Sequence, residues 1–131
     1  MSRTKAIVFD LYGVVGLEAG AGLRLNDELI PKLHELKSQY RLGLLTNSER
    51  SFVDRFLANN DLRPMFDVVL ASSQTRFVKP QREIFEIMAE RLDLPFDQIL
   101  LVDDSPSNVG AAQSYGMKAV LFQNVSSIID L

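Results

Sequence analysis

The stretch that decides the fold is KAIVFDLYGVV, residues 5–15. Residues 6–9 form a continuous apolar run rich in β-branched and aromatic side chains, which is typical of a strand buried on both faces of a parallel sheet. Asp10 follows this run directly, and Gly13 allows the chain to turn sharply. Ligands of open α/β sheets bind beyond the carboxyl ends of the strands. Asp10 is therefore a candidate reacting carboxylate, although Asp at such a place is also a common turn residue.

The composition, with 47% hydrophobic and 24% charged residues, is that of one globular domain over residues 1–131. The formal net charge of −3 gives no general attraction to nucleic acid or to anionic membranes, and no apolar run is long enough to span a membrane. The absence of cysteine excludes disulfides, thiolate zinc sites and a cysteine nucleophile. Because the first apolar run ends too early for a signal peptide, we expect a cytoplasmic protein.

Strand and helix patterns alternate along the rest of the chain, which predicts a single α/β domain with a parallel sheet. The glycine-rich residues 15–25 predict an irregular loop or a small flap, and a helix follows that begins near Asn26 or near Pro31. The other predicted strands are residues 41–45, 66–71, 98–102 and 118–122, and the other predicted helices are residues 49–59, 81–92, 106–116 and 125–131.

Several of these helices carry signals at their ends. Ser48 and Ser105 suit the N-cap position, where a hydroxyl accepts a hydrogen bond from the first turn. Pro80 is favourable at the first helical position, because its missing N–H would be unpaired there in any case. Gly116 can adopt the left-handed conformation that ends a helix.

Polar side chains gather where the predicted strands end and where one helix begins. They are Asp10, Thr46, Asn47, Ser48, Lys79, Asp103 and Asp104. If the chain crosses to the other side of the first strand after its third strand, Asp10 and Asp104 face each other across the crevice. Asn108, one helical turn after Asp104, is either a hydrogen-bond partner of this group or a solvated helix residue.

The chemistry of these side chains favours a metal ion and a phosphoryl group. Neighbouring carboxylates repel one another unless a cation lies between them, and ligation by oxygen alone suits Mg²⁺. Thr46 and Asn47 offer hydrogen-bond donors to a phosphoryl group, and Lys79 offers a positive charge. Asp10 could then attack phosphorus and form an aspartyl-phosphate that water cleaves.

Four stretches resemble, in order and in chain context, the four motifs of the haloacid dehalogenase (HAD) superfamily. They are FDLYGV (9–14), LLTNS (44–48), VKPQREIF (78–85) and ILLVDDSPSNV (99–109). The resemblance implies a three-layer, Rossmann-like α/β fold with helices on both faces of a five-stranded parallel sheet. With the strands numbered along the chain, the implied order is 5-4-1-2-3. Since most members are Mg²⁺-dependent phosphatases, it also implies that activity.

The resemblance also implies roles for individual residues. Asp10 matches the nucleophile, Thr46 the phosphate-binding hydroxyl, and Lys79 the lysine that stabilises charge. Asp103 and Asp104 match the metal-binding acidic pair, in which Asp104 resembles the direct ligand and Asp103 a supporting residue or one bound through water.

Tyr12 departs from the family pattern. Phosphatases of the family usually have an Asp at this position, which acts as the acid and base for the leaving group; a phenol with a pKa near 10 is a poor base at neutral pH. The family uses the backbone carbonyl of this residue as a metal ligand, and Tyr12 supplies one. The sequence DLYG is also the form found in 2-haloacid dehalogenases, which need no metal but lack the acidic pair. Phosphatase is favoured, and the alternatives are a dehalogenase-like hydrolase and a weakly active or inactive binding protein.

The chain has no room for the cap domain that often covers such a site. Residues 15–40 and 72–78 are too short for an inserted domain, so we expect a capless or minimally capped, open site. An open site admits a large phosphorylated substrate, such as a phosphoprotein or a polymer end, or takes its lid from another subunit of a homo-oligomer.

Overall fold

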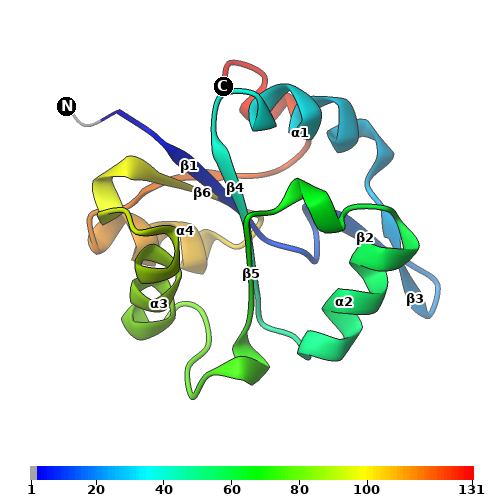
Figure 1. The fold of residues 1–131 in the computed structure, drawn as a ribbon, viewed down its shortest axis with the longest axis horizontal. Coiled ribbons are helices and arrows are strands. Elements are labelled where there is room, and N and C mark those ends of the chain that lie inside the picture. The colour runs from blue at the N-terminus through cyan, green and yellow to red at the C-terminus, as the bar shows by residue number, and fades with distance from the viewer. Residues whose placement is uncertain (1–2) are drawn as a thin grey trace.

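The computed structural model describes residues 3–131 and has three layers, with helices on both faces of a parallel sheet (Figure 1). The strands of this sheet are β1 (Ala6–Phe9), β4 (Arg41–Thr46), β5 (Val68–Ala71), β6 (Ile99–Asp103) and β7 (Lys118–Leu121). They lie in the order β5-β4-β1-β6-β7. Each strand thus has the neighbours that the resemblance implies, and the labels differ only because two hairpin strands, β2 and β3, are numbered as well.

Two pairs of helices cover the two faces of the sheet. The helices α1 (Ile30–Lys37) and α2 (Arg50–Asn59) lie on one side, and α3 (Arg82–Leu92) and α4 (Pro106–Ser114) lie on the other (Figure 1). Short 3-10 turns are formed by Asp27–Leu29, Arg63–Met65, Ser72–Gln74, Phe96–Gln98 and Val125–Ile128. Among residues 3–131, no helix is long and apolar enough to cross a membrane.

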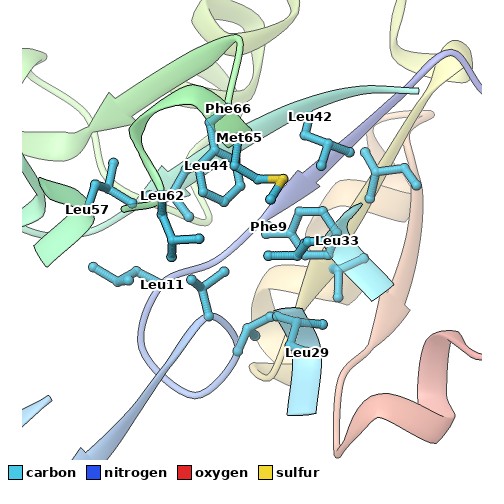
Figure 2. Packing of buried hydrophobic residues seen from close by; sticks show 14 of the residues in the cluster. Phe9, Leu11, Leu29, Leu33, Leu42, Leu44, Leu57, Leu62, Met65 and Phe66 are labelled. Atoms are coloured by element: carbon cyan, nitrogen blue, oxygen red, sulfur yellow. The ribbon is translucent and has the colours of Figure 1, made fainter. Parts of the chain in front are cut away.

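Strand β1 is buried on both faces, as its continuous apolar sequence predicts. Successive side chains of a strand point to opposite faces. Ile7 and Phe9 therefore join the cluster under α1 and α2, whereas Ala6 and Val8 join the cluster under α3 and α4. Figure 2 shows Phe9 packed among leucines of α1 and β4 and among residues that follow α2. This packing fixes the carboxyl end of β1, and with it Asp10.

The glycine-rich segment after β1 is an antiparallel hairpin, formed by β2 (Gly16–Ala19) and β3 (Gly22–Leu25). Of the two alternatives predicted for this segment, the irregular loop is wrong. The segment forms a small flap, and the flap is an ordered hairpin. Gly20 at the tip has a φ of 58°, which glycine adopts without strain. The base is held by Asn26, whose side-chain amide donates to the Val14 carbonyl at 2.9 Å.

Three predicted helix ends differ from the structure. Ser48 does not cap α2, because the helix begins at Arg50 and the Ser48 hydroxyl bonds to Thr46 instead. Pro80 lies outside α3, which begins at Arg82 after a cis Lys79–Pro80 bond. The C-terminal helix predicted over residues 125–131 is reduced to the 3-10 turn Val125–Ile128.

The N-cap predicted for α4 and the left-handed Gly116 after it are confirmed, although the helix ends at Ser114 rather than at residue 116. The Ser105 hydroxyl accepts a hydrogen bond from the Asn108 backbone N–H at 3.3 Å, which is the N-cap arrangement. Gly116 follows the helix with a φ of 100°, the left-handed conformation expected after a helix end.

Candidate active site

A cleft of about 330 Å³ opens at the carboxyl ends of β1, β4 and β6. Ser48 does not line it, but all the residues that the four motifs assign to the site do. They are Asp10, Tyr12, Thr46, Asn47, Lys79, Asp103 and Asp104. The cleft is also lined by Gly13, Ser105, Asn108 and Glu18, and sequence reasoning assigned no part to Glu18.

Lys79 is the centre of the buried charge network. Its Nζ donates to Asp10 Oδ1 at 2.9 Å, to Asp103 Oδ2 at 2.8 Å and to the Leu45 carbonyl at 2.9 Å. Lys79 is only 4% exposed, so its charge is compensated by two carboxylates rather than by water. The three contacts fix the ammonium between the ends of β1 and β6.

Asn47 positions this lysine through the backbone. Its side-chain amide donates to the Lys79 carbonyl at 3.1 Å, and its carbonyl oxygen accepts from the Lys79 N–H at 2.9 Å. The two bonds join the loop after β4 to the segment before α3, which the sequence separates by 32 residues. In this structure the Asn47 side chain therefore holds Lys79 in place, a task that sequence reasoning did not foresee.

The two acidic residues at the end of β6 have different surroundings. Asp103 is fully buried, and its oxygens accept hydrogen bonds from the Ser105 N–H, Lys79 Nζ and the Asn108 side-chain amide. Asp104 is exposed to the cleft. Asn108 is thus a hydrogen-bond partner of the acidic pair, and Asp104 is the member of the pair with freedom to bind a ligand.

Gly13 makes room for Asp104. A Cβ built on Gly13 would lie 2.1 Å from Asp104 Oδ2, closer than any real Cβ contact. The φ of 84° at Gly13 also disfavours other residues. The glycine in the first motif therefore serves both the turn after β1 and the position of a carboxylate from β6.

The carboxylates fit a magnesium ion. Asp10, Asp103 and Asp104 each offer an oxygen atom, and these atoms lie within 4.8 Å of one another. Hard oxygen donors are the ligands that suit Mg²⁺. Since both Asp103 oxygens already accept hydrogen bonds, Asp10 and Asp104 are the residues better placed to hold an ion directly.

The pKa of Asp10 is raised from 3.8 to about 7. Burial is the largest cause, because it disfavours the charged carboxylate; Asp103 and Asp104 raise the pKa further, while Lys79 lowers it. A cation bound between the carboxylates would favour the ionised form. Lys79 alone therefore does not offset the effect of burial on the pKa of Asp10.

Tyr12 forms part of the cleft wall. Its ring stacks on Phe52 of α2, with centroids 5.9 Å apart and planes 11° from parallel, and the residue is 41% exposed. Phe52 is half-buried, packs against the hydrophobic core and supports this ring. Thr46 is buried beneath, with its hydroxyl bonded to that of Ser48.

Comparison with known proteins places the chain among hydrolases. A family model for haloacid dehalogenase-like hydrolases matches residues 19–122. The chain is 31% identical, over 103 residues, to the pyrophosphatase PpaX of Bacillus mycoides; the match covers 72% of this chain and 48% of PpaX. It is 34% identical, over 79 residues, to a phosphoglycolate phosphatase of Salmonella paratyphi A, with 60% of this chain and 31% of that protein covered. The chain thus spans a third to a half of the length of these relatives.

Solved structures share the fold over nearly the whole chain. A HAD-superfamily hydrolase from Geobacter sulfurreducens has a TM-score of 0.83 at 18% identity, with 98% of this chain and 99% of that chain covered. A HAD family enzyme from Bacteroides thetaiotaomicron, in complex with magnesium and inorganic phosphate, has a TM-score of 0.84 at 15% identity, with 96% and 99% covered. The motifs, the strand order and the matched family model lead to one conclusion: this chain belongs to the haloacid dehalogenase-like hydrolases.

Proposed function

We propose that the protein is a Mg²⁺-dependent phosphatase that hydrolyses phosphomonoesters through an aspartyl-phosphate on Asp10. The observation that carries the proposal is the meeting of Asp10, Lys79 and Asp104 in one cleft, with Asp10 ion-paired to Lys79 at 2.9 Å. The names of the relatives, a pyrophosphatase and a phosphoglycolate phosphatase, support phosphate chemistry. The oxygen donors support Mg²⁺, which is also present in the Bacteroides structure.

In the first step, an Asp10 oxygen forms a bond to phosphorus as the bond to the leaving oxygen breaks. The leaving oxygen keeps the electron pair and takes up a proton from water. Lys79 holds the attacking carboxylate through Oδ1 and lowers its pKa, and the Thr46 hydroxyl donates a hydrogen bond to the phosphoryl group in this proposal. When Mg²⁺ is bound by Asp10, Asp104 and the Tyr12 carbonyl, it supplies charge neutralisation for that group.

In the second step, a water oxygen attacks the phosphorus of the aspartyl-phosphate. The bond to Asp10 breaks, its electron pair restores the carboxylate, and inorganic phosphate leaves with the protons of the attacking water. Lys79 remains beside Asp10 throughout and stabilises the returning negative charge.

The test is phosphate release from 4-nitrophenyl phosphate with Mg²⁺ and with a chelator, together with the melting temperature under both conditions. We expect Mg²⁺ to raise the melting temperature by several degrees and to increase release at least ~10-fold, and Asp104→Asn to lose both effects. Asp61→Asn is the matched control, because Asp61 is exposed and lies beyond α2. Binding of Mg²⁺ without release would favour the inactive binding protein, and halide release from a 2-haloacid would favour the dehalogenase.

The Tyr12 side chain predicts a strong dependence on the leaving group. Without a carboxyl acid at this position, an ester with a good leaving group, such as 4-nitrophenyl phosphate, is expected to react far faster than ethyl phosphate. Tyr12→Asp should raise kcat for ethyl phosphate relative to 4-nitrophenyl phosphate by about 100-fold. Tyr12→Asn should leave this ratio unchanged, because the Asn side chain has the size of Asp but cannot act as an acid. Equal ratios in both variants would show that proton transfer at this position is unimportant.

The open cleft suits large phosphorylated substrates, such as a phosphoprotein or a polymer end. The two internal segments that could cover the cleft are the hairpin of residues 16–25 and the segment 72–78, and neither forms a separate domain. We therefore include phosphate groups on macromolecules among the proposed substrates. A lid from a second subunit and the cytoplasmic location stay predictions.

A further inference from the structure

A second cleft of about 310 Å³ adjoins the catalytic cleft. It is lined by Tyr12, Glu18, Gly20, Ala21, Gly22, Leu23 and Phe52. Tyr12 and Glu18 line both clefts, so a substrate with its phosphoryl group at Asp10 has the second cleft within reach of its leaving group. We propose that this second cleft, the leaving-group cleft, binds the leaving group and selects planar groups that are uncharged or cationic over acidic ones. The proposal rests on the phosphatase function proposed above.

The register of the hairpin decides which charge faces the substrate. Glu18 pairs with Leu23 across the hairpin, and Leu17 pairs with Arg24. Successive side chains of a strand lie on opposite faces. Accordingly Glu18 and Leu23 line the leaving-group cleft, whereas Leu17 and Arg24 line a separate cleft. The hairpin thus presents its acidic residue to the catalytic side and its basic residue to the other.

The shape of the leaving-group cleft favours a flat group. The stacked rings of Tyr12 and Phe52 form one wall, and a planar group can extend such a stack. Leu23 adds an apolar surface. Gly20 also lines this cleft, and no heavy atom lies within 4 Å of its ideal Cβ position.

The charges in the two clefts disfavour an acidic leaving group. Among the residues described as lining either cleft, Lys79 is the one basic residue, and its Nζ already contacts Asp10, Asp103 and the Leu45 carbonyl. A carboxylate on the leaving group would meet Glu18 with no basic side chain of either cleft free to offset the repulsion. An ammonium group would be attracted to it.

The test uses three phosphate esters of 4-ethylphenol, which differ only at the end of the ethyl chain. One ends in an ammonium group (tyramine phosphate), one is unsubstituted, and one ends in a carboxylate, so that the leaving oxygen is nearly the same in all three. We expect kcat/KM for the ammonium ester to exceed that for the carboxylate ester by about 10-fold, chiefly through KM. Glu18→Gln should bring this ratio close to one, and Glu18→Lys should invert it.

Glu90→Lys makes the same change of charge on an exposed residue at the far end of α3 and should leave the ratio unchanged. A ratio near one in the wild type, or a ratio that Glu18→Lys does not alter, overturns the inference while phosphatase activity stands. If none of the three esters is hydrolysed with Mg²⁺, the proposed function fails first.

The preference for a flat leaving group is tested by comparing two aryl phosphates that differ in ring size. The wild type is expected to hydrolyse 2-naphthyl phosphate with a higher kcat/KM than phenyl phosphate, because the larger ring gains more from stacking. Tyr12→Leu should lower this ratio by about 3-fold. An unchanged ratio in Tyr12→Leu contradicts the assignment of the aromatic wall.

Discussion

Asp10→Asn is expected to abolish turnover and, at the same time, to stabilise the metal-free protein at pH 8. Turnover should fall by at least ~10⁴-fold, as for other catalytic nucleophiles, because the amide cannot form the acyl phosphate. Stability should rise because the exchange removes a buried negative charge. The same exchange at exposed Asp61 should change neither property.

The sign of the stability effect follows from the pKa of Asp10, which is raised from 3.8 to about 7 by burial and by the neighbouring carboxylates. Between these two values the folded protein binds more protons than the unfolded chain, so the free energy of unfolding falls as the pH rises. Each pKa unit corresponds to about 1.4 kcal/mol, and we expect Asp10→Asn to gain about 2–4 kcal/mol at pH 8 and little at pH 4.

The measurement is urea unfolding of both proteins between pH 4 and pH 8, with chelator and then with Mg²⁺. Saturating Mg²⁺ should reduce or reverse the advantage of the variant, because the wild type binds the ion more tightly. A variant that is less stable than the wild type at pH 8 without Mg²⁺ would contradict the proposed electrostatics of the cleft.

Lys79→Met is expected to lower the free energy of unfolding of the metal-free protein by about 3–5 kcal/mol at pH 8. The loss is large because Lys79 lies between Asp10 and Asp103, and its removal leaves two buried carboxylates without their cation. It should shrink as the pH falls to 5, because Asp10, whose pKa is raised to about 7, then takes up a proton. Turnover should be lost as well, since the nucleophile loses the contact that holds it.

Lys37→Met is the matched control for this substitution. Lys37 pairs with Asp67 at 3.5 Å, but both side chains are about a third exposed, and such pairs contribute at most about 1 kcal/mol. Urea unfolding of both variants at pH 5 and pH 8 separates the two cases. The prediction is contradicted if Lys79→Met lowers the free energy of unfolding by no more than Lys37→Met does, or by an amount that does not depend on pH. Either result would mean that Lys79 does not stabilise the fold by compensating the two buried carboxylates.

The sheet and the residues at its edge could be predicted because buried parallel strands leave a plain signal. The apolar run of β1 ends at Asp10, that of β4 ends at Thr46, and that of β6 ends at Asp103. Once the order of the strands is given, the three polar ends must meet. This geometry does not depend on the details of any side-chain contact, so the sequence is sufficient to predict it.

The contacts within the cleft could not be predicted, because they join residues far apart in the chain. Nothing near Asn47 indicates that its amide binds the backbone of Lys79, and nothing near Ser48 shows that it bonds to Thr46 rather than capping α2. Glu18 was missed for a related reason. The position of Glu18 depends on the register of the hairpin. The alternation of Leu23 and Leu25 after the Gly20 turn is the sequence signal that could have indicated this hairpin.

The hairpin can change in evolution more freely than the core of the protein. Its strands β2 and β3 form a sheet of their own, and Glu18 is exposed on it. Exchanges of exposed side chains usually change the free energy of unfolding by less than about 0.5 kcal/mol. Mutations at the Glu18 position can therefore alter substrate preference with little effect on folding, whereas Asp10 and Lys79 cannot change without affecting both. Descendants of one ancestral gene could diverge in substrate through this hairpin and retain an identical core.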